Sequence, residues 1–131
     1  MIAFRYCFLG TLISVTAPSW ADPSLECSAS ASSQVEIGNC VSRQLEQVNK
    51  ALAIALDIAS GSAKELDEVT GREIAYPALT KSQDAWEAHR KAHCDFVGST
   101  FGGGSGAGIA IASCQIELGR DRVKALLRNS N

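Results

Sequence analysis

The sequence lacks the patterns that mark the common catalytic sites. Its 131 residues include only two histidines, and no Ser/His/Asp set for nucleophilic catalysis can be read from them. The carboxylates are scattered along the chain, so their spacing identifies no pair suited to glycoside hydrolysis. No cysteines stand in a CxxC spacing, which argues against a four-cysteine metal site. The sequence therefore predicts that the protein is not an enzyme and that it holds neither a metal nor a cofactor.

Alternation of apolar and polar residues, the pattern of a half-buried strand, is also missing over any useful length. The apolar run at residues 6–16 is too short to span a bilayer comfortably. It follows Arg5 and precedes the segment Ser19-Trp20-Ala21, which places small residues at the two positions that a signal peptidase reads. We therefore predict a signal peptide over residues 1–21 and one domain over residues 22–131.

An uncleaved membrane anchor is the alternative to a signal peptide. It is disfavoured because Pro18 and small polar residues close the apolar run, and no stop-transfer charges follow. Neither Cys7 nor Cys27 lies in a lipobox, since the acidic Glu26 precedes Cys27. We expect a periplasmic or secreted protein that has no membrane anchor after cleavage.

Export determines how the cysteines are interpreted. Cys7 leaves with the signal peptide, and the even number that remains is typical of two disulfides in a small exported domain. Four cysteines allow three pairings, and we favour Cys27–Cys40 and Cys94–Cys114 because each pair flanks one local element. Each bridge would contribute about 3 kcal/mol through loop-closure entropy.

The charge balance limits the kinds of partner. Removal of Arg5 with the leader leaves 11 of the 12 Lys and Arg residues against 14 Asp and Glu, a net charge of −3. This mildly acidic balance argues against nucleic acid and against an anionic membrane surface as partners. It is compatible with a basic partner, and a solvated surface accounts for it equally well.

Helical spacing of apolar residues predicts an all-α bundle of three main helices. The first covers residues 34–59 and begins at the capping box Ser33-Gln34-Val35-Glu36, in which hydroxyl and carboxylate satisfy each other's backbone donors. Ser60-Gly61-Ser62 is predicted to break this helix. A second capping box then starts a short helix at residues 63–69, which Gly71 ends.

Two further helices complete the predicted bundle. One covers residues 77–97, with a proline in its first turn and Gly98 as a left-handed cap. The other covers residues 107–128, where Gly119 costs about 1 kcal/mol relative to Ala and so indicates close packing. Residues 22–32 show no periodicity and are predicted to form an arm, tied down only if its cysteine is bridged.

One face of the helix at residues 77–97 gathers side chains three or four residues apart: Gln83, Trp86, Arg90 and Cys94. An aromatic residue at helical spacing usually belongs to the core, so Trp86 is assigned to it. A half-buried guanidinium needs carboxylate or carbonyl partners, so Arg90 is interpreted as structural, with Glu36 or Glu46 as candidates. Arg122 on the last helix has a similar requirement.

His89 and His93 are four residues apart and share a helix face on which a metal ion can be held. The intervening Arg90-Lys91-Ala92 lacks the glutamate of a zinc hydrolase helix and places cations beside the site. Two surface histidines are the simpler interpretation. Metal storage is an alternative that requires zinc or copper to raise the melting temperature.

The spacing Q-x2-W-x3-R-x3-C on the same face resembles the signature of the LprI-like lysozyme-inhibitor domain family. A glycine-rich turn with serine follows in that family, as it does here in Gly103-Gly104-Ser105. The family positions after this turn are matched by Cys114, Leu118 and Arg122. The family positions before the helix are matched by Cys27, Glu36 and Cys40. Its L-D-x2-L-N segment is approximated by Leu45, Glu46, Val48 and Asn49.

The chain departs from the family pattern at three positions. Glu46 stands where the family has aspartate, Leu52 where a tyrosine is usual, and Gly119 where a threonine is common. These changes alter hydrogen-bonding groups and leave the scaffold positions in place. The resemblance covers nearly the whole exported chain and implies a helical domain and, for some members, inhibition of lysozyme.

If inhibition applies, we expect occlusion of the lysozyme active site. Lysozyme is basic with an acidic active-site cleft, so a mildly acidic helical body would associate with it electrostatically. A loop would enter the cleft; its residues are Gly102, Gly103, Gly104, Ser105 and Gly106. This run lacks the Gly-Lys-Ser/Thr ending of a phosphate loop, and a plain connection between helices is the simpler interpretation. The alternative function is an envelope interaction or stress module that binds another exported protein without affecting lysozyme.

Overall fold

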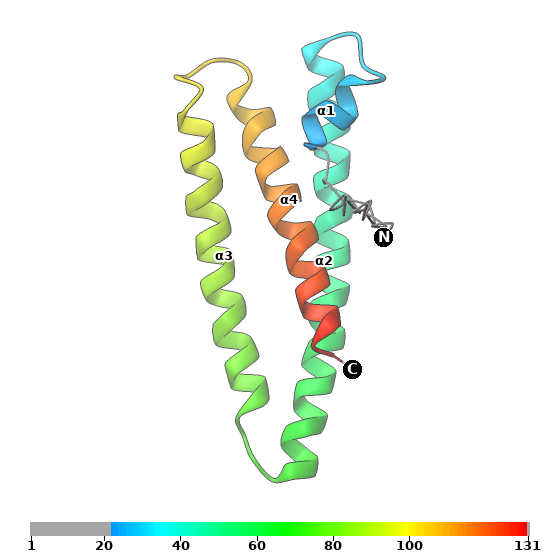
Figure 1. Ribbon diagram of the computed structural model, residues 1–131, viewed down its shortest axis with the longest axis vertical. Coiled ribbons are helices and arrows are strands. Elements are labelled where there is room, and N and C mark those ends of the chain that lie inside the picture. Colours follow the sequence, from blue (N-terminus) through cyan, green and yellow to red (C-terminus); the bar gives the residue numbers. More distant parts are fainter. Residues whose placement is uncertain (1–21, 131) are drawn as a thin grey trace, which may run out of the picture.

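The structure is a computed structural model that describes residues 22–130. These residues form four helices and no strand: α1 (Pro23–Ser28), α2 (Gln34–Thr70), α3 (Ala75–Ser99) and α4 (Ala107–Arg128). Helices α2, α3 and α4 alternate in direction, and α1 lies beside the start of α2 (Figure 1). The predicted all-α bundle is confirmed. The predicted signal peptide over residues 1–21 lies outside the described residues.

The arm predicted over residues 22–32 contains a short helix, α1, so that prediction was wrong. Six helical residues are too few to show a periodicity, but the local start signals are present. Asp22 is the N-cap and its Oδ1 accepts a hydrogen bond from the Ser24 amide at 2.8 Å, while Pro23 occupies the first helical turn. Cys27 is bridged to Cys40 on α2, as predicted, which fixes the helix to the bundle.

Helix α2 continues through Ser60-Gly61-Ser62 to Thr70, so the predicted break and the separate helix at residues 63–69 were wrong. The Ser62 hydroxyl does not cap a new helix. It donates to the carbonyl oxygen of Ser130 at 3.0 Å, which joins α2 to the end of α4. Burial of Ala59 just before the glycine also stabilises the continuous helix.

The start of α2 is defined by the residues that the sequence indicated, with one difference. Ser33 Oγ accepts the Glu36 amide at 3.3 Å, but the Glu36 carboxylate accepts from the amide of Ser32 rather than Ser33. The capping box is therefore shifted by one residue on one side. At the other end Gly71, which was predicted to stop the separate helix at residues 63–69, adopts a left-handed conformation with φ 64° and ends the continuous α2.

Asp67 connects the end of α2 to the start of α3. Its carboxylate accepts hydrogen bonds from the amides of Ile74, Ala75 and Tyr76 at 2.7–3.1 Å. These are the amides that have no partner within a helix at its first turn. The bonds, the one from Tyr76 foremost, hold the pKa of the Asp67 carboxyl below its usual value.

Close helix packing explains two glycines. Gly98 lies inside α3 and is not its left-handed cap, which corrects the prediction; a Cβ there would lie 2.5 Å from Ile111 of α4. A Cβ at Gly119 of α4 would lie 2.5 Å from Val48 Cγ1 and 3.3 Å from an Arg90 nitrogen. The close approach that the sequence indicated at Gly119 is therefore present.

The apolar core consists of two clusters along α4. One lies at the α1 end of the bundle and is formed by Cys27, Val41 and Ile116. The other lies nearer the α2–α3 turn and is formed by Leu52, Ala55, Ala59 and Leu126, with partly buried Trp86 packed against it. Helices α2 and α4 contribute buried residues to both clusters, and α3 packs against them through partly buried Leu79 and Trp86.

Glycine-to-alanine substitutions at two helical positions are expected to act in opposite directions. Gly61→Ala adds a methyl group with no atom within 4 Å and should raise the free energy of unfolding by up to about 1 kcal/mol. Gly119→Ala places a methyl group against Val48 and Arg90, which must move, and should lower the free energy of unfolding by about 1–3 kcal/mol. Chemical denaturation of both variants measures this difference. Equal stabilisation would contradict the close approach at Gly119.

An ion pair between α1 and α4 gives a pH-dependent prediction. Arg120 donates to both carboxylate oxygens of Glu26 at 3.0 and 3.1 Å, and this hydrogen-bonded cation lowers the pKa of the Glu26 carboxyl. Because the folded-state pKa lies below the unfolded one, the stabilisation is present at neutral pH and is lost as pH falls below about 4.5. Glu26→Gln should lower unfolding free energy by about 0.5–1 kcal/mol at pH 7. Thermal melts at several pH values should show this gap closing at acid pH, and a pH-independent gap would contradict the assignment.

Candidate functional site

The face of α3 that carries the family-like motif forms the seam with α4. Gln83 is buried, and its Oε1 accepts from Arg122 Nε at 3.0 Å. Cys94 is fully buried and bridged to Cys114, as predicted. The motif therefore joins two helices at both of its ends, which is a structural task.

Trp86 lies between two cations on this seam. The Arg90 guanidinium carbon lies 5.3 Å from the centre of its ring and that of Arg122 lies 5.7 Å away. Cations at this distance are attracted by the ring quadrupole. Trp86 also packs against the core cluster of Leu52 and Leu126, so its assignment to the core agrees with the structure.

Among the residues that the structure describes, Arg90 donates to carbonyl and amide oxygens and to no carboxylate. Its Nε and Nη2 donate to the Gln115 carbonyl oxygen at 3.1 and 2.8 Å, and Nη2 also donates to Asn49 Oδ1 at 2.9 Å. The prediction that Glu36 or Glu46 pairs with Arg90 was therefore wrong. Glu36 caps the start of α2, and Glu46 pairs with Lys50 one turn along the same helix. Burial lowers the pKa of the Arg90 guanidinium.

The glycine-rich turn joins α3 to α4 at the end of the bundle opposite the α2–α3 turn (Figure 1). Gly102 and Gly103 have φ values of 58° and 81°, which other residues rarely adopt. The Gly104 amide donates to the Phe101 carbonyl at 3.0 Å, and the Ala107 amide donates to the Gly104 carbonyl at 3.1 Å. The turn is therefore a sequence of two hydrogen-bonded turns with a defined shape.

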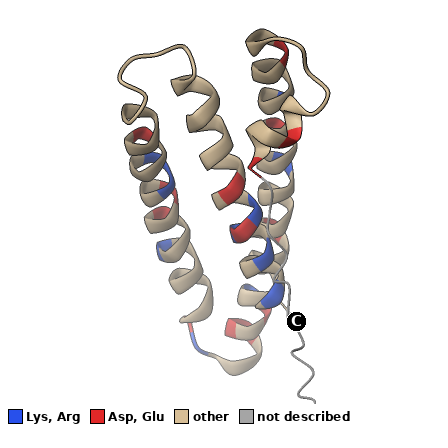
Figure 2. Cartoon of the chain, turned by 45° about the horizontal axis from the view of Figure 1, so that its top comes forward, with Lys and Arg blue, Asp and Glu red and all other residues tan. Residues whose placement is uncertain are grey.

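The turn is exposed and carries no charge. Residues 101–105 are all exposed, and the turn has neither the colour of acidic nor that of basic residues in Figure 2. Two surface hollows flank it. Ser105 lines one of about 450 Å³ together with Val35 and Gly38 of α2, while Phe101 and Gly106 line another of about 420 Å³ beside α1. The turn can therefore contact a partner both with its tip and with its sides.

The hollow beside α1 has polar groups in its wall. Ser113 Oγ is buried and has no hydrogen-bond partner among the described residues. Glu117 lines the same hollow, and burial, with the charge of Asp22 as a smaller cause, raises the pKa of its carboxyl. His93 also lines it. These groups form a polar patch behind the glycine turn.

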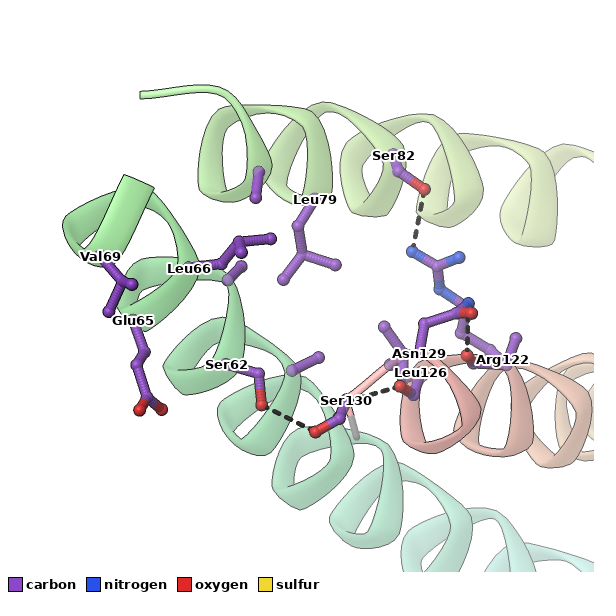
Figure 3. Close-up of a pocket in the computed structure, with 14 residues that line it drawn as sticks. Ser62, Glu65, Leu66, Val69, Leu79, Ser82, Arg122, Leu126, Asn129 and Ser130 are labelled. Carbon is purple, nitrogen blue, oxygen red and sulfur yellow. Dashed lines mark hydrogen bonds between the residues drawn. The ribbon is translucent and has the colours of Figure 1, made fainter. Parts of the chain in front are cut away.

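A larger cleft of about 590 Å³ lies at the other end of the bundle. It opens between α2 and α3 where α4 ends, and Leu66 and Leu79 point toward each other across it (Figure 3). Arg122 lines it and donates to Ser82 Oγ at 3.2 Å. The sequence did not indicate this cleft, because it arises from the different lengths of the three helices.

His89 and His93 stack on the exposed face of α3 with their ring centres 5.6 Å apart. Within residues 22–130, no group of three or more His, Cys, Asp or Glu side chains is arranged to hold a metal ion. No helix in that range is both long and apolar enough to cross a membrane.

The fold and its seam define a small helical domain held by two disulfides, with an exposed glycine turn at one end. A family model described as lysozyme inhibitor LprI matches residues 27–126 of the chain, which therefore belongs to this family. Its disulfides and the inhibitor family indicate an extracellular or periplasmic protein, with lysozyme as the partner that the family suggests.

The chain also resembles an uncharacterized protein, R02472, of Rhizobium meliloti (strain 1021). The two are 29% identical over 124 residues, covering 90% of this chain and 88% of that protein. No solved structure gives a significant match to the chain.

Substitution of Arg90 tests its interpretation as the link between three helices. Arg90→Lys keeps the charge but cannot donate to Gln115 and Asn49 in the same geometry, so it should lower the free energy of unfolding by about 1–2 kcal/mol. The control Arg43→Lys makes the same change at an exposed position of α2 and should have no measurable effect. Urea denaturation measures the free energy of unfolding of both variants. Equal stability of the two would refute the assignment.

Proposed function

We propose that the protein is an exported inhibitor of lysozyme that acts by occluding the active-site cleft of the enzyme. Membership of the lysozyme inhibitor family supports the target. Two disulfides in a small domain suit an oxidising compartment outside the cytoplasm, in line with a signal peptide cleaved after Ala21. The protein binds and blocks, and it performs no chemistry of its own.

The observation that carries the occlusion hypothesis is the shape of the turn at residues 102–106. The turn projects at one end of the bundle, is free of charge and is fixed by its own hydrogen bonds (Figures 1 and 2). The Cys94–Cys114 bridge ties α3 to α4 behind it. A fixed loop loses little conformational entropy on binding, which favours insertion into a concave site.

Charge supports the same arrangement. The part of the chain that follows Ala21 carries a net charge of −3, and lysozyme is a basic protein. Opposite net charges speed the encounter of the two proteins. The acidic active-site cleft would repel carboxylates, so an uncharged segment is the part of this protein best suited to enter it. Helix faces with Asp and Glu then contact the basic surface around the cleft.

The proposal is tested by the lysis of bacterial cell walls. Purified exported protein is mixed with lysozyme, and the fall in turbidity of a cell-wall suspension is followed over time. Inhibition that saturates as the protein concentration rises is expected. Unchanged lysis at a large excess of protein would contradict inhibition of lysozyme. The alternative, binding of a different exported protein, would then be favoured.

A charge placed on the turn tests where the inhibitor binds. Ser105→Glu brings a carboxylate to an acidic cleft and should raise the concentration for half-inhibition about tenfold, whereas Ser105→Lys should not weaken inhibition. Ala88→Glu adds the same charge on the exposed face of α3 away from the turn and serves as the control. Circular dichroism checks that each variant is folded. Equal inhibition by both Glu variants would contradict entry of the turn into the cleft.

A further inference from the structure

The cleft at the α2–α3 end is not used by the proposed contact with lysozyme. Helix α4 ends at Arg128, and just after it the carbonyl oxygen of Ser130 accepts from Ser62 of α2. From Ser62 to Thr70, α2 extends for about 12 Å at 1.5 Å per residue without α4 beside it. The groove between α2 and α3 therefore continues past the end of the helix that fills it (Figures 1 and 3).

The open part of this groove is apolar. Leu66 and Val69 of α2 and Leu79 of α3 line it, and the first two are 54% and 79% exposed. Ile74 and Tyr76 are exposed beside it at the start of α3. Apolar side chains gathered in this way on a small domain indicate a contact surface rather than scattered exposed residues.

The rim of the groove at the α2–α3 turn carries more carboxylates than cations. Glu65 lines it, and Glu68 and Glu73 lie close along the chain, opposed by Lys64 and Arg72. Asp67 is occupied with the amides at the start of α3. Residues 64–73 therefore carry a net charge of −2. A partner with basic side chains beside its apolar ones complements this rim.

Helix α4 shows which kind of segment the groove accepts. Its last turns fill the covered part of the groove with Val123 and Leu126, which belong to the core cluster shared with α2 and α3. The same turns carry basic side chains: Arg122, Lys124 and Arg128. The open part continues this interface with the same two helices as walls. Arg122, the cation within the cleft, is turned toward Ser82 and Gln83 and away from the open end.

We propose that the α2–α3 end binds a basic amphipathic helical segment of a protein partner, laid in the groove beyond α4. Its apolar face covers Leu66, Val69 and Leu79, and its Lys or Arg side chains face the carboxylates of the rim. This is the helix-in-groove mode of recognition. The surface lies at the opposite end from residues 102–106 and needs no contribution from them (Figure 1).

Two synthetic helical peptides of 14 residues test this recognition. Both carry leucine on one face; the other face is lysine in one peptide and glutamate in the second. Binding to the purified exported protein is followed by fluorescence anisotropy. The lysine peptide should bind saturably, one per chain, and more weakly as salt rises, while the glutamate peptide should not bind. Equal binding of both peptides would overturn the proposal.

Matched variants locate the site. Val69→Asn removes an exposed apolar group from the groove and should weaken binding of the lysine peptide about tenfold. Val35→Asn makes the same change on the same helix at the far end, where valine is 72% exposed, and should leave binding unchanged. Glu65→Gln should weaken binding, whereas Asp57→Asn, on α2 but outside the groove, should not. Equal effects within either pair would overturn the assignment.

Two further measurements test whether a second copy of the chain occupies the groove and whether the groove acts independently of the inhibitor site. Sedimentation of the protein alone should show no self-association that depends on Val69; self-association lost in Val69→Asn would assign the groove to a second copy and overturn the proposal. Ser105→Glu should leave peptide binding unchanged, and Val69→Asn should leave lysozyme inhibition unchanged. Peptide binding lost in Ser105→Glu would contradict a groove that acts independently of the glycine turn.

Discussion

The Arg90 guanidinium is the point at which the three long helices meet. It extends from α3, donates to the Gln115 carbonyl of α4 and to Asn49 of α2, and lies against the Trp86 ring. This arrangement requires that no side chain stand at Gly119, where a Cβ would lie 3.3 Å from the guanidinium. This half-buried polar group thus links all three helices and contributes to their relative positions.

The two ends of the bundle are built by different means. At one end, the Cys27–Cys40 and Cys94–Cys114 bridges hold α1 and the α3–α4 turn, so a backbone rich in glycine keeps a defined position. At the other end no disulfide is present within the described chain, and Asp67 holds the α2–α3 turn through three amides. The first end presents uncharged backbone, whereas the second presents an apolar groove with an acidic rim. Each end is therefore suited to a different kind of partner surface.

Much of the scaffold could be predicted from the sequence, because local signals determined it. Helical spacing located α3 and α4, Gly71 ended α2, and cysteines flanking local elements indicated the correct pairing. The errors arose where a distant contact prevailed over a local signal. Ser62 bonds to Ser130, so it does not start a helix, and Gly98 makes room for Ile111, so it does not end one. The partners of Arg90 and the apolar groove depend on how three helices of unequal length are aligned, which no short sequence pattern encodes.

The unbroken course of α2 has a mechanical consequence. Its 37 residues make a rod of about 55 Å, and both ends of the bundle are attached to that one rod. This span exceeds the Debye length of about 8 Å at physiological ionic strength, so a charge bound at one end is screened from the other. If partners bind at both ends, the length of this rod sets the distance between them. A break at Gly61 would have turned the same chain into a hinge.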